Sequence, residues 1–101
     1  MRKSDKKIEN TIRIVLTEVC EQLKEQVAGF EWLTHTVDYN NVNQTLTVTF
    51  MFDSFASLRS AKATLKTNDM ATDAANALAK QNIHLKNVTK QCYFDTDERN
   101  G

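Results

Sequence analysis

Residues 45–52 read Thr-Leu-Thr-Val-Thr-Phe-Met-Phe. Every second position from 46 to 52 holds a large apolar residue, and the positions between them hold threonines and Met51. Successive side chains of a strand point to opposite faces, so this period of two predicts a β-strand with an apolar core face and a threonine-rich outer face. The branched and aromatic side chains of the stretch are also those that strands favour. A sheet is therefore expected, and the rest of the chain is assigned around it.

A second strand is predicted just upstream. The larger residues at positions 33, 35, 37 and 39 alternate with threonine and aspartate, which is again the period of a half-buried strand. Residues 40–43, Asn-Asn-Val-Asn, interrupt this alternation. Asparagine tolerates left-handed backbone angles and bonds to its own backbone, so the run predicts a turn that joins two antiparallel strands as a hairpin.

An amphipathic helix precedes the hairpin. Between Ile8 and Val27, apolar residues recur at steps of three and four, and most charged residues lie off that stripe. This spacing predicts a helix of about 23 residues with one buried face. Ser4 or Asp5 can supply the side-chain oxygen that accepts an N–H of the first turn. Gly29 can adopt the left-handed backbone that commonly follows a last turn.

Helical signals return after residue 52. Asp53 and Ser54 can cap a helix that begins near Phe55, and residues 67–69 offer a second start before another apolar stripe. One kinked helix and two separate helices both fit residues 54–81. Strand-like composition returns from Ile83, and a third strand is predicted over residues 88–95.

These elements follow one another in the order α-β-β-α-(α)-β. The predicted fold is a single α+β domain over residues 1–101, a two-layer sandwich in which a three-stranded sheet carries its helices on one face. The composition agrees with a globular domain, because 41% of the 101 residues are hydrophobic and 26% are charged. The polar ends, residues 1–4 and 96–101, are expected to be mobile.

The sheet face away from the helices is the main functional candidate. By strand parity it is expected to show nine residues without formal charge: Trp32, Thr34, Thr36, Thr47, Thr49, Met51, Thr89, Gln91 and Tyr93. Monomer surfaces usually intersperse Lys and Glu, so an uncharged face with large rings predicts contact with a second chain or a ligand. We expect a homodimer formed through this face, and an unidentified protein partner is another occupant. The competing interpretation is that threonine is the ordinary residue of a solvated strand face.

Seven basic residues form the rival candidate, a phosphate-contacting patch on the helical side: Arg2, Lys3, Lys6, Lys7, Arg59, Lys62 and Lys66. Such a patch would make the chain a nucleic-acid-binding or ribosome-associated protein. The formal net charge is zero and the pI is about 6.7, so no overall field attracts the chain to nucleic acid or anionic lipid. The alternative interpretation is a solvated helix end of mixed charge.

The sequence contains no recognisable enzyme or metal motif. No two of its cysteines and histidines have the short spacing typical of zinc sites: Cys20, His35, His84 and Cys92. Both cysteines fit buried thiols. The carboxylates of Asp95, Asp97 and Glu98 lack the spacing of a calcium loop and fit a solubilising end. Two glycines cannot build a phosphate-binding loop. We therefore expect no catalytic activity, no metal and no cofactor.

The expected compartment is the cytoplasm. No stretch approaches the apolar length of a membrane span. Residues 1–10 also lack the apolar core of a secretory signal.

Three stretches resemble a group of small bacterial proteins of similar length: RKSDKKIENTIRIVLTEVCEQL, GFEWLTHTVDYN and CYFDTDE. Some of these are labelled Fis-type transcriptional regulators, which implies DNA binding through a C-terminal helix-turn-helix; residues 86–95 of this chain are strand-like instead. The order of elements also resembles the type II KH arrangement and ribosome-binding factor A, which closes with a similar aromatic and acidic stretch. The KH resemblance implies recognition of single-stranded RNA by a GxxG loop between two helices, where residues 65–68 of this chain contain no glycine.

Overall fold

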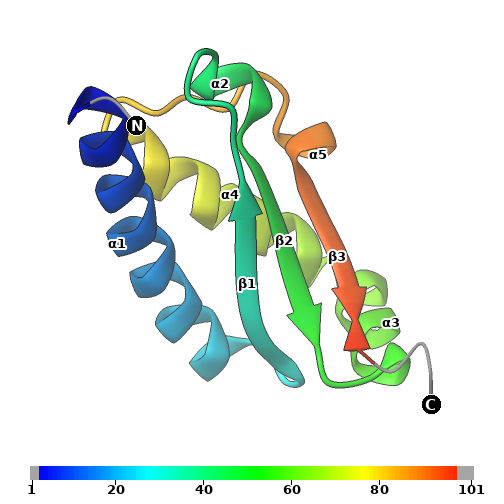
Figure 1. The fold of residues 1–101 in the computed structure, drawn as a ribbon. Coiled ribbons are helices and arrows are strands. Elements are labelled where there is room, and N and C mark those ends of the chain that lie inside the picture. The colour runs from blue at the N-terminus through cyan, green and yellow to red at the C-terminus, as the bar shows by residue number, and fades with distance from the viewer. Residues whose placement is uncertain (1–2, 98–101) are drawn as a thin grey trace.

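Helices and strands follow one another in the predicted order (Figure 1). The computed structural model describes residues 3–97. Its elements are α1 (Lys3–Gln26), β1 (Phe30–Thr36), α2 (Val42–Thr45), β2 (Thr47–Phe52), α3 (Phe55–Ala63), α4 (Lys66–Ala79), α5 (Val88–Gln91) and β3 (Cys92–Thr96). The predicted α+β class is confirmed, and α2 and α5 are short additions to the predicted order.

The three strands form one sheet in the order β1-β2-β3. β1 and β2 are antiparallel, with Leu33 opposite Phe50 and Thr36 opposite Thr47, whereas β3 runs parallel to β2. A parallel partner needs a crossover connection, which α3 and α4 provide. In Figure 1 the strands lie in front of α4, and no helix lies in front of them. The helices therefore cover one face of the sheet, as predicted.

The core lies between the apolar stripe of α1 and the inner face of the sheet. The stripe consists of Ile12, Val15, Leu16, Val19, Leu23 and Val27, all buried. On the sheet, Phe50 stacks on Phe94 with 5.0 Å between ring centroids and 13° between ring planes. Phe30 meets Phe50 with 6.0 Å between ring centroids. Truncating a buried leucine or phenylalanine of this kind to alanine costs roughly 2–5 kcal/mol, so these contacts fix which face of β2 is turned inward.

Residues 54–81 fold as two helices, which settles the alternative that the sequence left open. The side chain of Ser54 caps α3 by accepting a hydrogen bond from the N–H of Ser57 (3.1 Å). α3 ends at Ala63 with Thr64 as its C-cap, and Leu65 then takes a left-handed backbone with φ 63°. This conformation costs a residue that has a Cβ roughly 1–2 kcal/mol. Leu65 is 64% exposed, so burial of its side chain offsets little of that cost.

The third strand is shorter than predicted. Residues 88–91 form the helical turn α5, which the side chain of Asn87 caps, so the strand starts only at Cys92. The side-chain amide of Gln91 donates to the backbone oxygens of Leu46 (2.9 Å) and Asn43 (3.0 Å). Its Oε1 accepts from the N–H of Asn87 (2.6 Å). This buried amide ties the end of the crossover to the connection between β1 and β2.

The β1–β2 connection and the C-terminal end also differ from expectation. The connection contains α2 in place of a tight asparagine turn, and the N–H of Asp38 donates to the Thr45 hydroxyl (2.9 Å). Thr96, which the sequence places in a mobile end, is 1% exposed within β3. At the other end, Lys3 and Ser4 already belong to α1. Residues 1–2 and 98–101 of the predicted ends lie outside the described residues.

Gly29 joins the two layers at the end of α1. Its φ of +85° is the left-handed conformation predicted for the residue after the last turn. Its carbonyl oxygen accepts from the N–H of Asp53 (2.8 Å), just after β2. A Cβ placed on Gly29 would overlap the Cβ and Oγ of Ser57. The first turn of α3 therefore packs directly against this glycine.

Candidate functional site

The uncovered side of the sheet, here called the open face, is the candidate site. Eight residues form it: Trp32, Thr34, Thr36, Thr47, Thr49, Met51, Tyr93 and Asp95. They stand in rows across the strands. Thr49 lies between Thr34 and Tyr93. In the next row, Met51 lies between Trp32 and Asp95.

Two rings project from the outer strands of the open face. Trp32 on β1 is 41% exposed and Tyr93 on β3 is 55% exposed. Met51 between these strands is only 9% exposed, so it forms a floor below the rings together with the threonines. Tryptophan and tyrosine each combine a large apolar surface with one hydrogen-bond donor. The face thus offers apolar area at its sides and hydroxyl groups at its centre.

The prediction that Thr89 and Gln91 share this face is wrong. Both belong to α5, where strand parity does not apply. Gln91 is buried, and Thr89 lines a groove on the helix side of the sheet. Asp95 is the member that sequence reasoning missed. Its parity with Tyr93 was the available signal, but Asp95 was assigned to an acidic C-terminal end.

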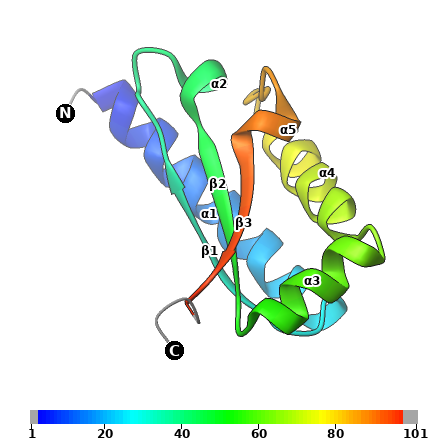
Figure 2. The same cartoon turned by 90° about the vertical axis from the view of Figure 1, so that its right-hand side faces the viewer.

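The basic residues predicted to contact phosphate do not form one patch. Lys6 and Lys7 lie on the first turns of α1. Figures 1 and 2 show the start of α1 and the α3–α4 junction at opposite ends of the molecule, which is 41 Å long. That junction carries the remaining described members: Arg59, Lys62 and Lys66. Arg2 and the side chain of Lys3 lie outside the described residues.

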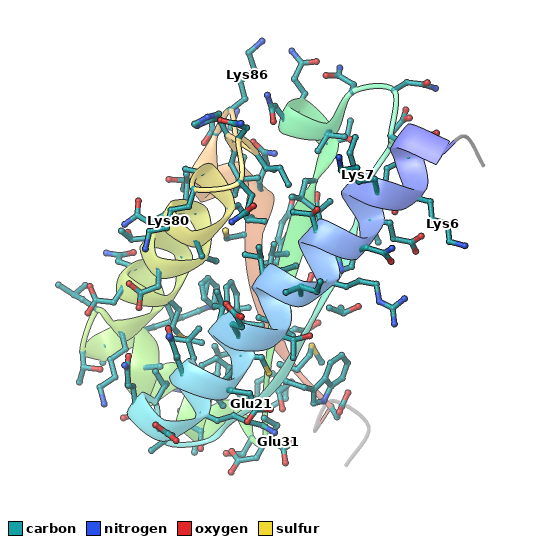
Figure 3. All side chains as sticks on the ribbon, turned by 90° about the vertical axis from the view of Figure 1, so that its left-hand side faces the viewer. Lys6, Lys7, Glu21, Glu31, Lys80 and Lys86 are labelled. Atoms are coloured by element: carbon teal, nitrogen blue, oxygen red, sulfur yellow. The ribbon has the colours of Figure 1, made fainter. Side chains whose placement is uncertain are left out.

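Figure 3 shows a different grouping of charge. One half of the molecule holds Lys6, Lys7, Lys80 and Lys86, here called the lysine end, and the other half holds Glu21 and Glu31. Asp5 and Glu9 of α1 lie in the same half as the lysines, so the charge of the lysine end is mixed. A cavity of about 330 Å³ opens at the lysine end between α1 and the segment after α4, and Lys7 and Asn82 are among its lining residues. The sequence did not suggest this grouping because only the direction of α4 brings Lys80 toward the start of α1.

Burial shifts two titratable groups near the core. It raises the pKa of the Cys92 thiol to about 11, so the nucleophilic thiolate is scarce at neutral pH. Burial also lowers the pKa of His35, where Arg13 acts in the same direction and Glu9 opposes it. Cys20 is half-buried and shares a shallow hollow with His35. Neither cysteine forms a disulfide.

The structure describes both segments in which the resembled families carry their nucleic-acid-binding elements, residues 86–95 and 65–68. Residues 86–95 contain α5 and most of β3, and Thr64 and Leu65 join α3 to α4. Among residues 3–97, no three His, Cys, Asp or Glu side chains gather as a metal site would require. No described helix combines the length and apolar character needed to cross a membrane.

No protein-family model matches the chain, and no curated protein or solved structure is significantly similar to it.

Proposed function

We propose that the protein is a small binding module that self-associates by packing the open face of one copy against the open face of another. One observation carries this proposal: no described helix covers the sheet face that bears Trp32, Met51 and Tyr93. Exposed aromatic side chains on a surface with few charges are typical of interface centres. A cytoplasmic location and a role in binding, without catalysis, belong to the same proposal.

The charges of the open face suit such a pairing. Asp95 is the one charged member, and it stands on an outer strand in the same row as Trp32. A two-fold axis parallel to β2 places β1 of one copy over β3 of the other. Trp32 then approaches Asp95 of the second copy, so its indole N–H can donate to the carboxylate. The pairing therefore avoids placing the two carboxylates against each other.

Packing of faces is favoured over pairing of strand edges. β1 contains an irregularity between Phe30 and Trp32, and β3 has only five residues. Bulges and short strands are the usual devices that prevent edge-to-edge association. The proposed contact consequently uses side chains and leaves the strand edges outside the interface.

The size of the open face predicts a weak dimer. Three strands about 4.8 Å apart and six residues of about 3.3 Å each give a flat area of about 300 Å². A standard interface buries about 800 Å² on each partner. The projecting rings enlarge the contact without closing this gap. We therefore expect a dissociation constant in the micromolar range or weaker.

Sedimentation velocity of the wild-type chain from about 10 μM to 1 mM tests the proposal. The sedimentation coefficient should rise with concentration. Thr49→Lys places an ammonium at the centre of the face and should weaken dimerisation at least about tenfold, because a buried unpaired charge is costly. Thr17→Lys is the matched control, since Thr17 is exposed on α1 and its hydroxyl donates only to Arg13 O (2.7 Å).

Trp32 supplies a second readout because it is the only tryptophan. Dilution of the wild-type protein should shift its emission to longer wavelength, and Thr49→Lys should show the shifted emission at all concentrations. A wild-type chain that stays monomeric throughout the range would overturn the proposal. Equal weakening by Thr49→Lys and Thr17→Lys would overturn it as well.

The lysine end supports a second candidate function, nucleic-acid binding. The observation that favours it is the grouping of Lys6, Lys7, Lys80 and Lys86 in one half of the molecule (Figure 3). Contacts to phosphate weaken steeply with added salt. Binding to fluorescent single-stranded RNA should therefore fall as salt rises and should be lost in a Lys7→Glu, Lys86→Glu double variant. A Lys62→Glu, Lys66→Glu variant is the charge-matched control, and equal loss in both would refute this candidate.

A further inference from the structure

The cavity at the lysine end has the lining of a small-molecule site. Its apolar part consists of Ile8 on α1, Val42 on α2 and Ile83 after α4. All three side chains belong to the hydrophobic core or pack against it, so this part of the cavity exists before any ligand binds. The volume of about 330 Å³ lies at the lower end of the range of ligand pockets. The cavity therefore suits a small ligand with an apolar body.

Hydrogen bonds of Asn43 hold one polar wall of the cavity in place. The side-chain Oδ1 of Asn43 accepts from the N–H of His84 (3.0 Å), and its backbone oxygen accepts from the N–H of Lys86 (3.0 Å). These bonds tie α2 to the segment after α4. Because Oδ1 is already an acceptor, the half of the amide that remains for a ligand is its NH₂ group, which donates.

The turn at the end of α4 fixes the neighbouring wall. Asn82 takes a left-handed backbone with φ 64°, and the N–H of Ile83 donates to the backbone oxygen of Leu78 (3.0 Å). This arrangement is a common helix termination. It engages a carbonyl of the last turn and leaves Ile83 buried. The wall thus presents amide side chains above an apolar base.

Lys7 is the one charged residue in the lining of the cavity. Asp5 and Glu9 each stand two positions from Lys7 on α1, so both project about 200° away from it around the helix. Burial raises the pKa of Tyr39, which follows β1, and the nearby carboxylates of Glu9 and Asp5 add to this shift. These carboxylates therefore lie on the β1 side of α1, and the cavity receives the positive charge of Lys7 without them.

We infer that this cavity binds a small monocarboxylate with a compact apolar body. The body packs against Ile8, Val42 and Ile83, and the carboxylate accepts hydrogen bonds from Lys7 and the Asn43 amide, of which the first is charge-assisted. One cation matches one negative charge, whereas a free phosphate has no apolar part to fill the base. The inference goes beyond both proposed functions, since it requires neither a second copy of the chain nor RNA.

An NMR titration of the isotope-labelled full chain with sodium benzoate, up to about 20 mM, tests this inference. Benzamide is the neutral probe of the same shape, and acetate carries the charge without the ring. Benzoate should shift the backbone amide resonances of Ile8, Val42 and Ile83, with a dissociation constant in the millimolar range. Benzamide and acetate should bind at least about threefold more weakly, because each lacks one of the two contacts.

Lys7→Met removes the charge of the cavity and keeps the length of an exposed side chain. It should weaken benzoate about three- to tenfold and leave benzamide unchanged. Lys6→Met is the matched control, because Lys6 is exposed on the same turn but lies outside the lining, and Figure 3 shows it on a different side of α1 from Lys7. Lys86→Met removes a cation of the lysine end that does not line the cavity, so it should weaken any binding of RNA and leave benzoate binding unchanged.

Three results would overturn the inference. The first is the absence of benzoate-induced shifts at the lining residues over the whole titration. The second is an equal loss of benzoate binding in Lys7→Met and in either Lys6→Met or Lys86→Met, because benzoate would then respond to the general charge of the lysine end. The third is binding of benzamide as tight as that of benzoate, which would exclude the carboxylate.

Discussion

Replacing Gly29 by alanine tests how the helix layer is joined to the sheet. The φ of +85° at this position costs a residue that has a Cβ roughly 1–2 kcal/mol. The added Cβ would also overlap Ser57 and lie 3.0 Å from Oδ1 of Asp53. Forcing an extra carbon into a packed site typically costs about 1–3 kcal/mol. We therefore expect Gly29→Ala to lower the free energy of unfolding by about 2–5 kcal/mol.

Urea denaturation followed by circular dichroism measures this loss, and a double-mutant cycle separates its two causes. Ser57→Gly removes the Cβ and Oγ that the new methyl group would meet. In that background Gly29→Ala should cost only the backbone contribution of roughly 1–2 kcal/mol. The difference between the two backgrounds, about 1–3 kcal/mol, is the energy of the overlap.

Two results would refute this reasoning. One is the same loss for Gly29→Ala in both backgrounds, because the overlap with Ser57 would then contribute nothing. The other is a total loss below about 0.5 kcal/mol, which is the range of ordinary surface substitutions. Either result would mean that α3 does not pack against the glycine as described.

Three further predictions concern stability and reactivity. Leu65→Gly should leave the free energy of unfolding unchanged or raise it by up to about 1 kcal/mol, because glycine adopts the left-handed backbone without strain. The control is Ile14→Gly at an exposed position within α1, which should lower the free energy of unfolding by about 1 kcal/mol. Urea denaturation measures both variants. Gln91→Leu should cost about 2–4 kcal/mol in the same assay, because it leaves Leu46 O and Asn87 N–H without the amide that pairs with them; a loss under about 1 kcal/mol would contradict the role given to Gln91. Burial raises the pKa of Cys92 from 9.0 to about 11, so its thiolate fraction at pH 8, and hence its labelling by a chromogenic thiol reagent, should be about a hundredfold lower in the native than in the unfolded chain. As the pH rises, the thiol of Cys92 loses its proton at a lower pH in the unfolded chain than in the native chain. The contribution of Cys92 to stability is therefore complete below pH 9 and is lost as the pH rises toward 11. Equal labelling rates of Cys92 before and after unfolding would contradict its burial.

Local patterns predicted the parts of the fold that depend on neighbouring residues. The alternation around Phe50 identified β2 and its inner face, and Gly29 marked the end of α1. The same reasoning failed at Gln91, whose partners Asn43 and Leu46 lie 48 and 45 positions away in the sequence. In the sequence, Gln91 occupies an alternate position of a strand-like stretch, as a solvent-exposed residue of a strand would. Its burial becomes evident only when the distant segment that its amide contacts is known.

The candidate sites divide in the same way. Strand parity identified seven members of the open face because the alternation is local. The lysine end forms only because α4 crosses the sheet in a direction that brings Lys80 toward the start of α1. The spacing of residues along the sequence does not predict that direction.

The parallel placement of β3 has a consequence for biosynthesis. β2 lies in the middle of the sheet, yet one of its two strand neighbours is Cys92–Thr96, near the C-terminal end of the sequence. During translation β2 is made long before β3, at roughly 5–20 residues per second. Until β3 has been synthesised, one flank of the most apolar strand has no strand partner, so β2 can complete its sheet only after the whole α3–α4 crossover has been made.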